Sequence, residues 1–159
     1  MSYYTADLWD EYSDELTLLN VPLNAYGKNR LFHGEVVTLK VYEDNSLVKA
    51  ELLTNGKDKV LVVDGGGSRR CALVGDNLAQ LAIENEWSGI IIYGCIRDSE
   101  QINDMDVGIK AIGTCPVKSI KKNEGIKSQD LIIEGTQIKN GDYLYADADG
   151  VLLANRKLK

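Results

Sequence analysis

Three charged side chains carry most of the chemistry that this sequence could perform. Asp76 is followed by twenty intervening residues and then by the adjacent pair Arg97 and Asp98. A guanidinium group can bind a carboxylate or an enolate oxygen through two parallel hydrogen bonds. A single aspartate is an adequate protein ligand for Mg²⁺, which keeps several of its waters. The pattern predicts a site where an anion binds beside a divalent cation.

The elements around these residues would have to bring them together. Gly75-Asp76-Asn77-Leu78 opens a stretch with apolar residues at helical spacing, and the apolar run 89–96 predicts a strand that ends at Arg97. In a parallel β-α-β unit, the carboxyl end of the strand and the start of the helix lie at one edge of the sheet, where ligands bind. Free amides at the helix start would bind an anion without a basic side chain.

Each feature has a simpler explanation when it is taken alone. Asp76 could serve only as a helix cap, a common role for aspartate. Arg97 and Asp98 could be a surface pair in a loop. We favour the functional interpretation because both segments point to the same edge of the sheet, and it requires their side chains to reach one small molecule.

The remaining sequence predicts one α/β domain over residues 1–159 with a β-rich C-terminal portion. The continuous apolar run 60–64 is typical of a strand covered on both faces. Asn140-Gly141-Asp142 and Asp149-Gly150 predict hairpin turns and antiparallel pairing. Further strands are expected at 34–41, 107–112, 117–119, 131–133, 143–146 and 151–153. A helix is expected at 47–53, and another after a Ser99 cap. A third helix should follow a Thr5 cap, because Leu8, Tyr12 and Leu16 recur at helical spacing.

Composition excludes several classes of protein. The chain has 24 acidic and 18 basic residues and a pI near 4.8, which does not fit direct contact with nucleic acid. Its N-terminus lacks the pattern of a signal peptide, and no apolar run approaches the length of a membrane span. We therefore expect a cytoplasmic protein that contacts neither nucleic acid nor membrane.

Other residues that could do chemistry are better explained as structural. Cys71, Cys95 and Cys115 form no CxxC pair and are expected to be small buried hydrophobic residues. His33 is the only histidine, so Ser-His-Asp and Cys-His mechanisms would both depend on it. The loop 65–68 lacks a P-loop Lys-Ser/Thr and the GxGxxG spacing, so it indicates a tight passage of the backbone, although it could also form one wall of the cleft.

Four runs around these residues have the composition of a known family. They are VVDGGGS at 62–68, ALVGD at 72–76, IIYGCIRD at 91–98 and DVGIKA at 106–111. Together they strongly resemble the RraA-like family, which includes the regulator of ribonuclease E activity A and the 4-hydroxy-4-methyl-2-oxoglutarate aldolases. The resemblance runs from about Thr5 to Leu153 and reproduces the spacing from Asp76 to Arg97 and Asp98 that the aldolases carry.

The resemblance implies a role for each site residue. The loop Gly75, Asp76, Asn77 and Leu78 would hold a pyruvate-like carboxylate, and Arg97 would bind the keto or enolate oxygen. Asp98 would bind Mg²⁺ or Mn²⁺, and Asp76 would position a water for proton transfer. The fold would be the three-layer β/β/α swivelling-domain architecture, assembled as a homotrimer with its sites at subunit contacts.

The resemblance also implies a reaction and a rival function. The reaction is metal-dependent cleavage of 4-hydroxy-4-methyl-2-oxoglutarate into two pyruvates, with oxaloacetate decarboxylation through the same enolate. The rival is a protein that inhibits ribonuclease E by binding to it, a function in which the aspartate after the arginine can be missing. Asp98 is present, which favours the enzyme. Related sequences have also been named menaquinone methyltransferases. This sequence has no glycine-rich nucleoside loop that would support that function.

Overall fold

The computed structural model describes residues 3–159. Met1 and Ser2, the first residues of the predicted domain, lie outside the described residues. The strands are β1 (Thr17–Leu18), β2 (Asn24–Tyr26), β3 (Phe32–Lys40), β4 (Lys59–Asp64), β5 (Ala72–Val74), β6 (Gly89–Ile96), β7 (Ile109–Thr114), β8 (Ile126–Lys127), β9 (Leu131–Ile133), β10 (Thr136–Ile138), β11 (Tyr143–Asp147) and β12 (Gly150–Ala154).

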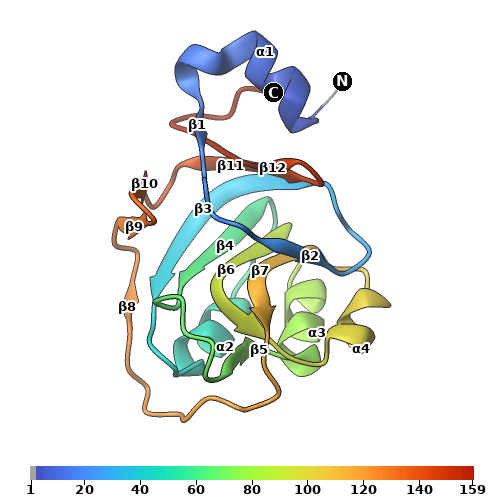
Figure 1. The fold of residues 1–159 in the computed structure, drawn as a ribbon, viewed down its shortest axis with the longest axis vertical. Coiled ribbons are helices and arrows are strands. Elements are labelled where there is room, and N and C mark those ends of the chain that lie inside the picture. Colours follow the sequence, from blue (N-terminus) through green and yellow to red (C-terminus); the bar gives the residue numbers. More distant parts are fainter. Residues whose placement is uncertain (1–2) are drawn as a thin grey trace.

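The helices gather mainly on one side of the sheet (Figure 1). They are α1 (Thr5–Tyr12), α2 (Ser46–Leu52), α3 (Asp76–Glu84) and α4 (Ser99–Asn103), with a 3₁₀ turn at Ser13–Glu15. In Figure 1, α2, α3 and α4 lie at one end of the molecule and α1 lies at the other, beside the C-terminus. Within residues 3–159, no helix is long and apolar enough to span a membrane.

A curled sheet forms the centre of the described chain. Its strands follow the order β1-β12-β11-β3-β4-β6-β7-β2, and β5 and β8 pair with β6 and β3. The neighbours β3, β4, β6 and β7 are parallel, whereas β11 and β12 pair antiparallel with each other and β11 with β3. The predicted mixed sheet with a parallel centre is confirmed.

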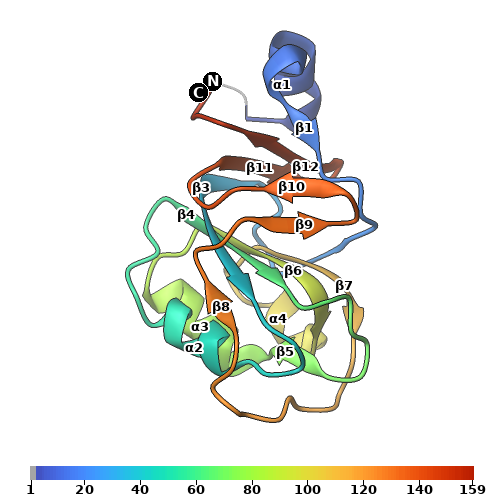
Figure 2. The same ribbon diagram turned by 90° about the vertical axis from the view of Figure 1, so that its left-hand side faces the viewer.

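Both faces of the parallel strands are buried, as their continuous apolar sequences require. In β4, Leu61 and Val63 belong to the core beneath α2 and α3, while Val60 and Val62 belong to a second core that includes residues of β9 to β12. The hairpin β9–β10 lies beside the sheet in Figure 2. One core lies between the helices and the parallel strands, and the other lies between the parallel strands and the C-terminal strands. This layering confirms the predicted mixed α/β architecture.

Some predicted boundaries were wrong for local reasons. The turn at Gly141 does not close a hairpin, because β10 pairs with β9 and β11 pairs with β3. The hairpin that sequence reasoning missed turns at Glu134 and Gly135, whose φ angles of 47° and 81° allow a two-residue turn. Residues 117–119 form only an isolated bridge between Lys118 and Ala72, and the strand predicted at 107–112 spans Ile109–Thr114.

The predicted caps Thr5 and Ser99 are instead the first helical residues. Tyr4 occupies the N-cap of α1 and Asp98 that of α4. The Thr5 hydroxyl and amide both donate hydrogen bonds of 2.7 Å to Asp147 on β11. Thr5 therefore fastens α1 to the sheet, and Leu8 adds a buried apolar contact beside Tyr145.

Thr5→Val should destabilise the protein by about 1–3 kcal/mol, because it removes a buried hydrogen bond to a carboxylate while keeping the shape of the side chain. The measurement is the free energy of unfolding by urea. Thr54→Val is the matched control, since the Thr54 hydroxyl bonds to the Glu51 carbonyl at an exposed position. Equal effects of the two changes would show that the Thr5 contact does not fasten α1.

Candidate active site

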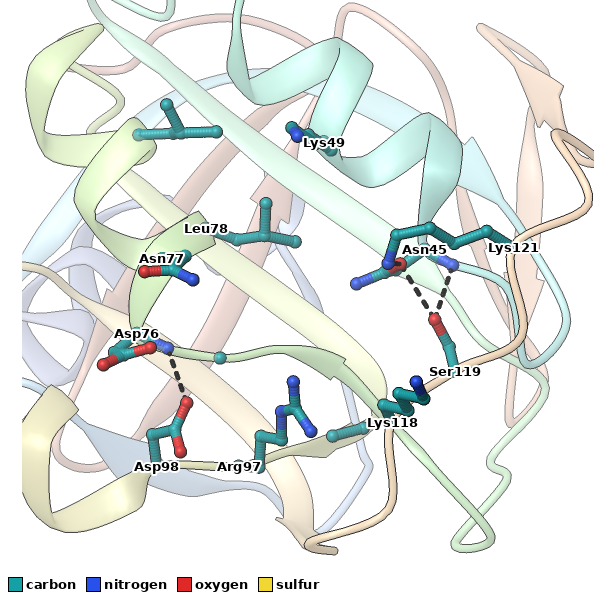
Figure 3. A pocket seen from close by; sticks show the side chains of 13 residues that line it. Asn45, Lys49, Asp76, Asn77, Leu78, Arg97, Asp98, Lys118, Ser119 and Lys121 are labelled. Carbon is teal, nitrogen blue, oxygen red and sulfur yellow. Dashed lines mark hydrogen bonds between the residues drawn. The ribbon is translucent and has the colours of Figure 1, made fainter.

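The end of β6 and the start of α3 meet through one hydrogen bond. The Asp76 amide donates to Oδ2 of Asp98 over 3.0 Å (Figure 3). Arg97 is tied to the same place because its amide donates to the Val74 carbonyl over 2.9 Å. The two segments thus converge at the carboxyl edge of the parallel strands, as the sequence predicted.

The backbone around this contact is unusual at two positions. Asp98 adopts a left-handed conformation with φ 57° and ψ 38°, which aspartate tolerates better than most residues. Gly75 has ordinary extended torsions, but a Cβ atom there would lie 2.7 Å from Oδ2 of Asp98. Any side chain at position 75 would therefore push the carboxylate away from the Asp76 amide.

Asp76 does not cap α3, although a capping role was the simpler explanation. Gly75 occupies the N-cap without a side-chain hydrogen bond, and Asp76 is the first helical residue. Its amide is satisfied by Asp98, which acts as a cap supplied by another segment. The Asp76 carboxylate accepts no hydrogen bond from the described residues, so it is available to bind a ligand or a water molecule.

Several hydrogen-bond donors are left for an anion. The Arg97 side chain is exposed and makes no hydrogen bond or ion pair with any described residue. The amides of Asn77 and Leu78 lie in the first turn of α3, where helices leave N–H groups without internal partners. A carboxylate would thus meet two free amides and a guanidinium, whereas the Asp76 amide is already occupied.

The carboxylates here fit a hard divalent cation. Oδ2 of Asp98 accepts the hydrogen bond from Asp76, and Oδ1 accepts none from the described residues. Within residues 3–159 no group of three or more His, Cys, Asp or Glu side chains could hold a metal ion. One or two carboxylates with bound waters suffice for Mg²⁺, so Asp98, with Asp76 beside it, has the right donor chemistry.

These residues line one wall of a cavity of roughly 410 Å³. Lys49 from α2 and Lys118 and Lys121 from the loop after β7 also line this cavity (Figure 3). With Arg97 they outnumber the two aspartates, so the cavity favours anions even though the chain has a net charge of −6. Sequence reasoning missed these lysines.

A signal for them was present in the sequence. Lys118 and Lys121 follow β7, whose carboxyl end lies at the same edge of the sheet as that of β6. Placing β7 beside β6 would therefore have placed these lysines near Arg97.

The glycine loop 65–68 does not form a wall of this cavity, because none of its residues lines it. Gly66 and Gly67 instead adopt φ angles of 68° and 70°, which supports the tight-passage interpretation.

A polar network fixes the loop that carries the lysines. The Ser119 hydroxyl donates to Oδ1 of Asn45 over 2.8 Å, and Nζ of Lys121 donates to the same oxygen over 3.1 Å. Buried Asp44 accepts hydrogen bonds from the amide and hydroxyl of Ser46 through Oδ1, and from the amides of Lys122 and Glu124 through Oδ2. Burial alone would raise the pKa of Asp44, but these bonds lower it to about 2.

The histidine and cysteines lie outside this cavity, as expected. Nδ1 of His33 is 2.8 Å from the Tyr143 hydroxyl, and the imidazole ring stacks on Tyr3. Cys71 and Cys95 are buried, as predicted, and burial raises the pKa of both thiols. The prediction was wrong for Cys115, which is only partly buried because it follows the end of β7. None of them contributes to the site.

Comparison with known proteins gives concordant matches. The RraA-like family model, described as Aldolase/RraA, matches residues 5–153. A protein of Arabidopsis thaliana named "Putative 4-hydroxy-4-methyl-2-oxoglutarate aldolase 3" is 49% identical over 162 residues, which cover 99% of this chain and 98% of the relative.

Two solved structures are similar over nearly their whole length. S-adenosylmethionine:2-dimethylmenaquinone methyltransferase from Geobacillus kaustophilus HTA426 has a TM-score of 0.95 and 51% identity, covering 98% of this chain and 96% of its own. The RNA-processing inhibitor RraA from Thermus thermophilis has a TM-score of 0.96 and 39% identity, covering 100% and 96%.

Asp44→Asn should lower stability by roughly 2 kcal/mol at pH 7, because the depressed pKa measures how strongly the fold favours the charged carboxylate. The folded pKa of about 2 lies below that of an unfolded aspartate, roughly 4. This stabilisation is therefore complete above about pH 4 and is lost as pH falls through 2.

Urea unfolding of Asp44→Asn and of the natural protein across this pH range tests the linkage, with exposed Asp130→Asn as the control. A stability difference that stays constant from pH 7 to pH 2 would contradict the assignment.

Proposed function

The chain belongs to the RraA-like family, and we propose that it is a metal-dependent aldolase that cleaves 4-hydroxy-4-methyl-2-oxoglutarate into two pyruvates. Its relatives in plants and bacteria carry that name. The observation that carries the proposal is the contact between Asp98 and the Asp76 amide, which places Arg97, two free helix amides and a free carboxylate oxygen around one cavity.

Substrate binding follows from the positions of the cations and free amides. The 2-oxo acid end would place its carboxylate on the amides of Asn77 and Leu78, where the helix dipole favours negative charge. Its keto oxygen would accept hydrogen bonds from Arg97. The second carboxylate would then face Lys118 and Lys121 across the cavity.

Asp98 would hold a divalent cation through its free Oδ1. Water molecules positioned by Asp76 would complete the coordination. Mg²⁺ or Mn²⁺ bound there would act as a Lewis acid and stabilise negative charge on the substrate oxygen. A lysine that forms a Schiff base is not required by this chemistry. Asp98 has two tasks, since its other oxygen caps α3.

The reaction needs one proton removed and one returned. A base removes the C4 hydroxyl proton, and the C3–C4 bond breaks. One pyruvate is released, and the electron pair of the broken bond forms the enolate of the other. Arg97 stabilises the enolate oxygen, and a water held by Asp76 transfers the proton that converts the enolate into pyruvate. The predicted homotrimer would let a neighbouring subunit close the cavity and exclude bulk water.

Oxaloacetate decarboxylation uses the same arrangement. Loss of CO₂ from oxaloacetate leaves the same pyruvate enolate, which Arg97 would stabilise in the same way. We therefore propose it as a secondary activity. One structural neighbour is named as a methyltransferase. A glycine-rich loop that could bind a nucleoside would be expected at such a site, but the glycine loop 65–68 does not line this cavity.

Inhibition of ribonuclease E is the second candidate function. It is favoured by the similarity to the RNA-processing inhibitor RraA, and a net charge of −6 would suit a basic partner surface. Binding of that kind would not need the free oxygen of Asp98. The same variant therefore separates the two functions.

Asp98→Asn should reduce pyruvate release by about a hundredfold or more, because it removes the charge on the metal ligand while the amide oxygen can still cap α3. A coupled pyruvate assay with 4-hydroxy-4-methyl-2-oxoglutarate and with oxaloacetate measures the loss. A chelator should abolish both activities, and added Mg²⁺ or Mn²⁺ should restore them.

The control for this experiment is Asp106→Asn, at an exposed position outside the cavity. Absence of pyruvate under every metal condition, together with ribonuclease binding that Asp98→Asn leaves unchanged, would support the regulator and refute the enzyme.

Lys121→Gln should lower kcat/KM for the two-carboxylate substrate about tenfold, because it removes a charge-assisted contact to the second carboxylate. Inhibition by pyruvate, which lacks that group, should change little. Steady-state kinetics with pyruvate as inhibitor measure both effects, and exposed Lys28→Gln is the control. A parallel loss of pyruvate affinity would place Lys121 at the wrong end of the substrate.

A further inference from the structure

A second cavity lies on the other face of the parallel sheet. Ile109 and Ala111 of β7 face the helices, so the residue between them, Lys110, faces the opposite side. Lys110 there lines a cavity of roughly 320 Å³ between the segment 18–23 and the tip of the β11–β12 hairpin. This cavity shares no lining residue with the one around Arg97.

Lys110 is a largely buried residue whose ammonium group reaches the cavity and pairs with no described residue. The residue is only 4% exposed, and no described residue forms a hydrogen bond or an ion pair with its ammonium group. A buried charge is unfavourable unless it is paired or hydrogen-bonded. Burial accordingly lowers the pKa of Lys110, and the nearby Asp147 carboxylate opposes this only in part. The side chain is thus one that an anion in the cavity would stabilise.

The nearest carboxylates do not fill this role. Both oxygens of Asp147 are occupied by hydrogen bonds of 2.7 Å from the amide and hydroxyl of Thr5, and Oδ1 also accepts from the Asp149 amide over 2.9 Å. Asp149 lies at the exposed hairpin tip and makes no ion pair with Lys110. The Arg30 guanidinium adds positive charge nearby.

Part of the cavity wall is apolar. Leu18, Leu19, Val21, Leu23 and Val151 contribute to it. Its volume is at the lower end of the range for small-molecule sites, which commonly combine apolar walls with a few placed polar groups. A ligand with one anionic end and a short hydrocarbon part would match both features.

We propose that this cavity binds a small aliphatic carboxylate, whose charged group pairs with the Lys110 ammonium and whose hydrocarbon part contacts the leucine and valine side chains of the segment 18–23. Asp149 at the rim is a competitor for the same ammonium, because it lines the cavity and carries the same charge as the ligand. The site is separate from catalysis and does not depend on the proposed reaction.

The test is a ¹H–¹⁵N chemical-shift titration of the full chain with sodium butyrate at pH 7. The amides of Asn20, Val21, Leu23 and residues 148–151 should shift. Butan-1-ol, which has the same chain without the charge, should cause much smaller changes. Shifts confined to Asn77 and Leu78, or equal effects of butanol, would overturn the proposal.

Three variants sharpen this test. Lys110→Met should weaken butyrate binding about tenfold or more, because a charge-assisted pair is lost, and Asp149→Asn should strengthen it by removing the competing charge. Arg97→Ala should leave it unchanged. Retained affinity in Lys110→Met, or loss of it in Arg97→Ala, would refute the assignment.

The thermal midpoint of Lys110→Met gives a readout that does not depend on the ligand. Replacing this unpaired charge, on a side chain that is largely buried, with an apolar side chain of similar length should raise the midpoint. A lower midpoint, or failure to fold, would show that the ammonium has a structural partner and would likewise overturn the proposal.

Discussion

The hydrogen bond from the Asp76 amide to Asp98 is the constraint on which the candidate active site depends. It joins the start of α3 to the residue that follows β6, two segments that a parallel crossover brings to one edge of the sheet. It also occupies one aspartate oxygen and one amide, which leaves the other oxygen, the next two amides and Arg97 directed to the cavity. An aspartate that capped its own helix would not have linked the two segments.

The parallel centre of the fold and this convergence were both predictable from the sequence. The apolar runs of β4 and β6 and the breaks after them identify buried parallel strands, and the residues after such strands meet at one edge. Identifying the Asp98 oxygen as the cap of α3 was not possible, because a cap from a distant segment leaves no local pattern. Asp76 in the first turn has the same sequence signal whether it caps the helix or not.

The errors elsewhere have a related cause. Asn140-Gly141 and Glu134-Gly135 both have turn chemistry, but only the second joins paired strands, since β11 pairs with β3. Thr5 was predicted to be a helix cap on the assumption that its hydroxyl bonds to a nearby backbone amide. Its actual partner, Asp147, is 142 positions away in the sequence. Lys118 and Lys121 were overlooked because their importance depends on the position of β7 in the sheet. In each case a long-range contact decided the role of a residue.

Gly75 offers a practical criterion for sorting related sequences. It contributes no functional group, yet its missing side chain is what allows the Asp98 carboxylate to reach the helix start. A homologue could keep both aspartates and the arginine and still lose their arrangement through one added methyl group at this position. Searches that rank relatives by their charged residues alone would misassign such a protein, so the glycine belongs in the diagnostic signature on an equal footing.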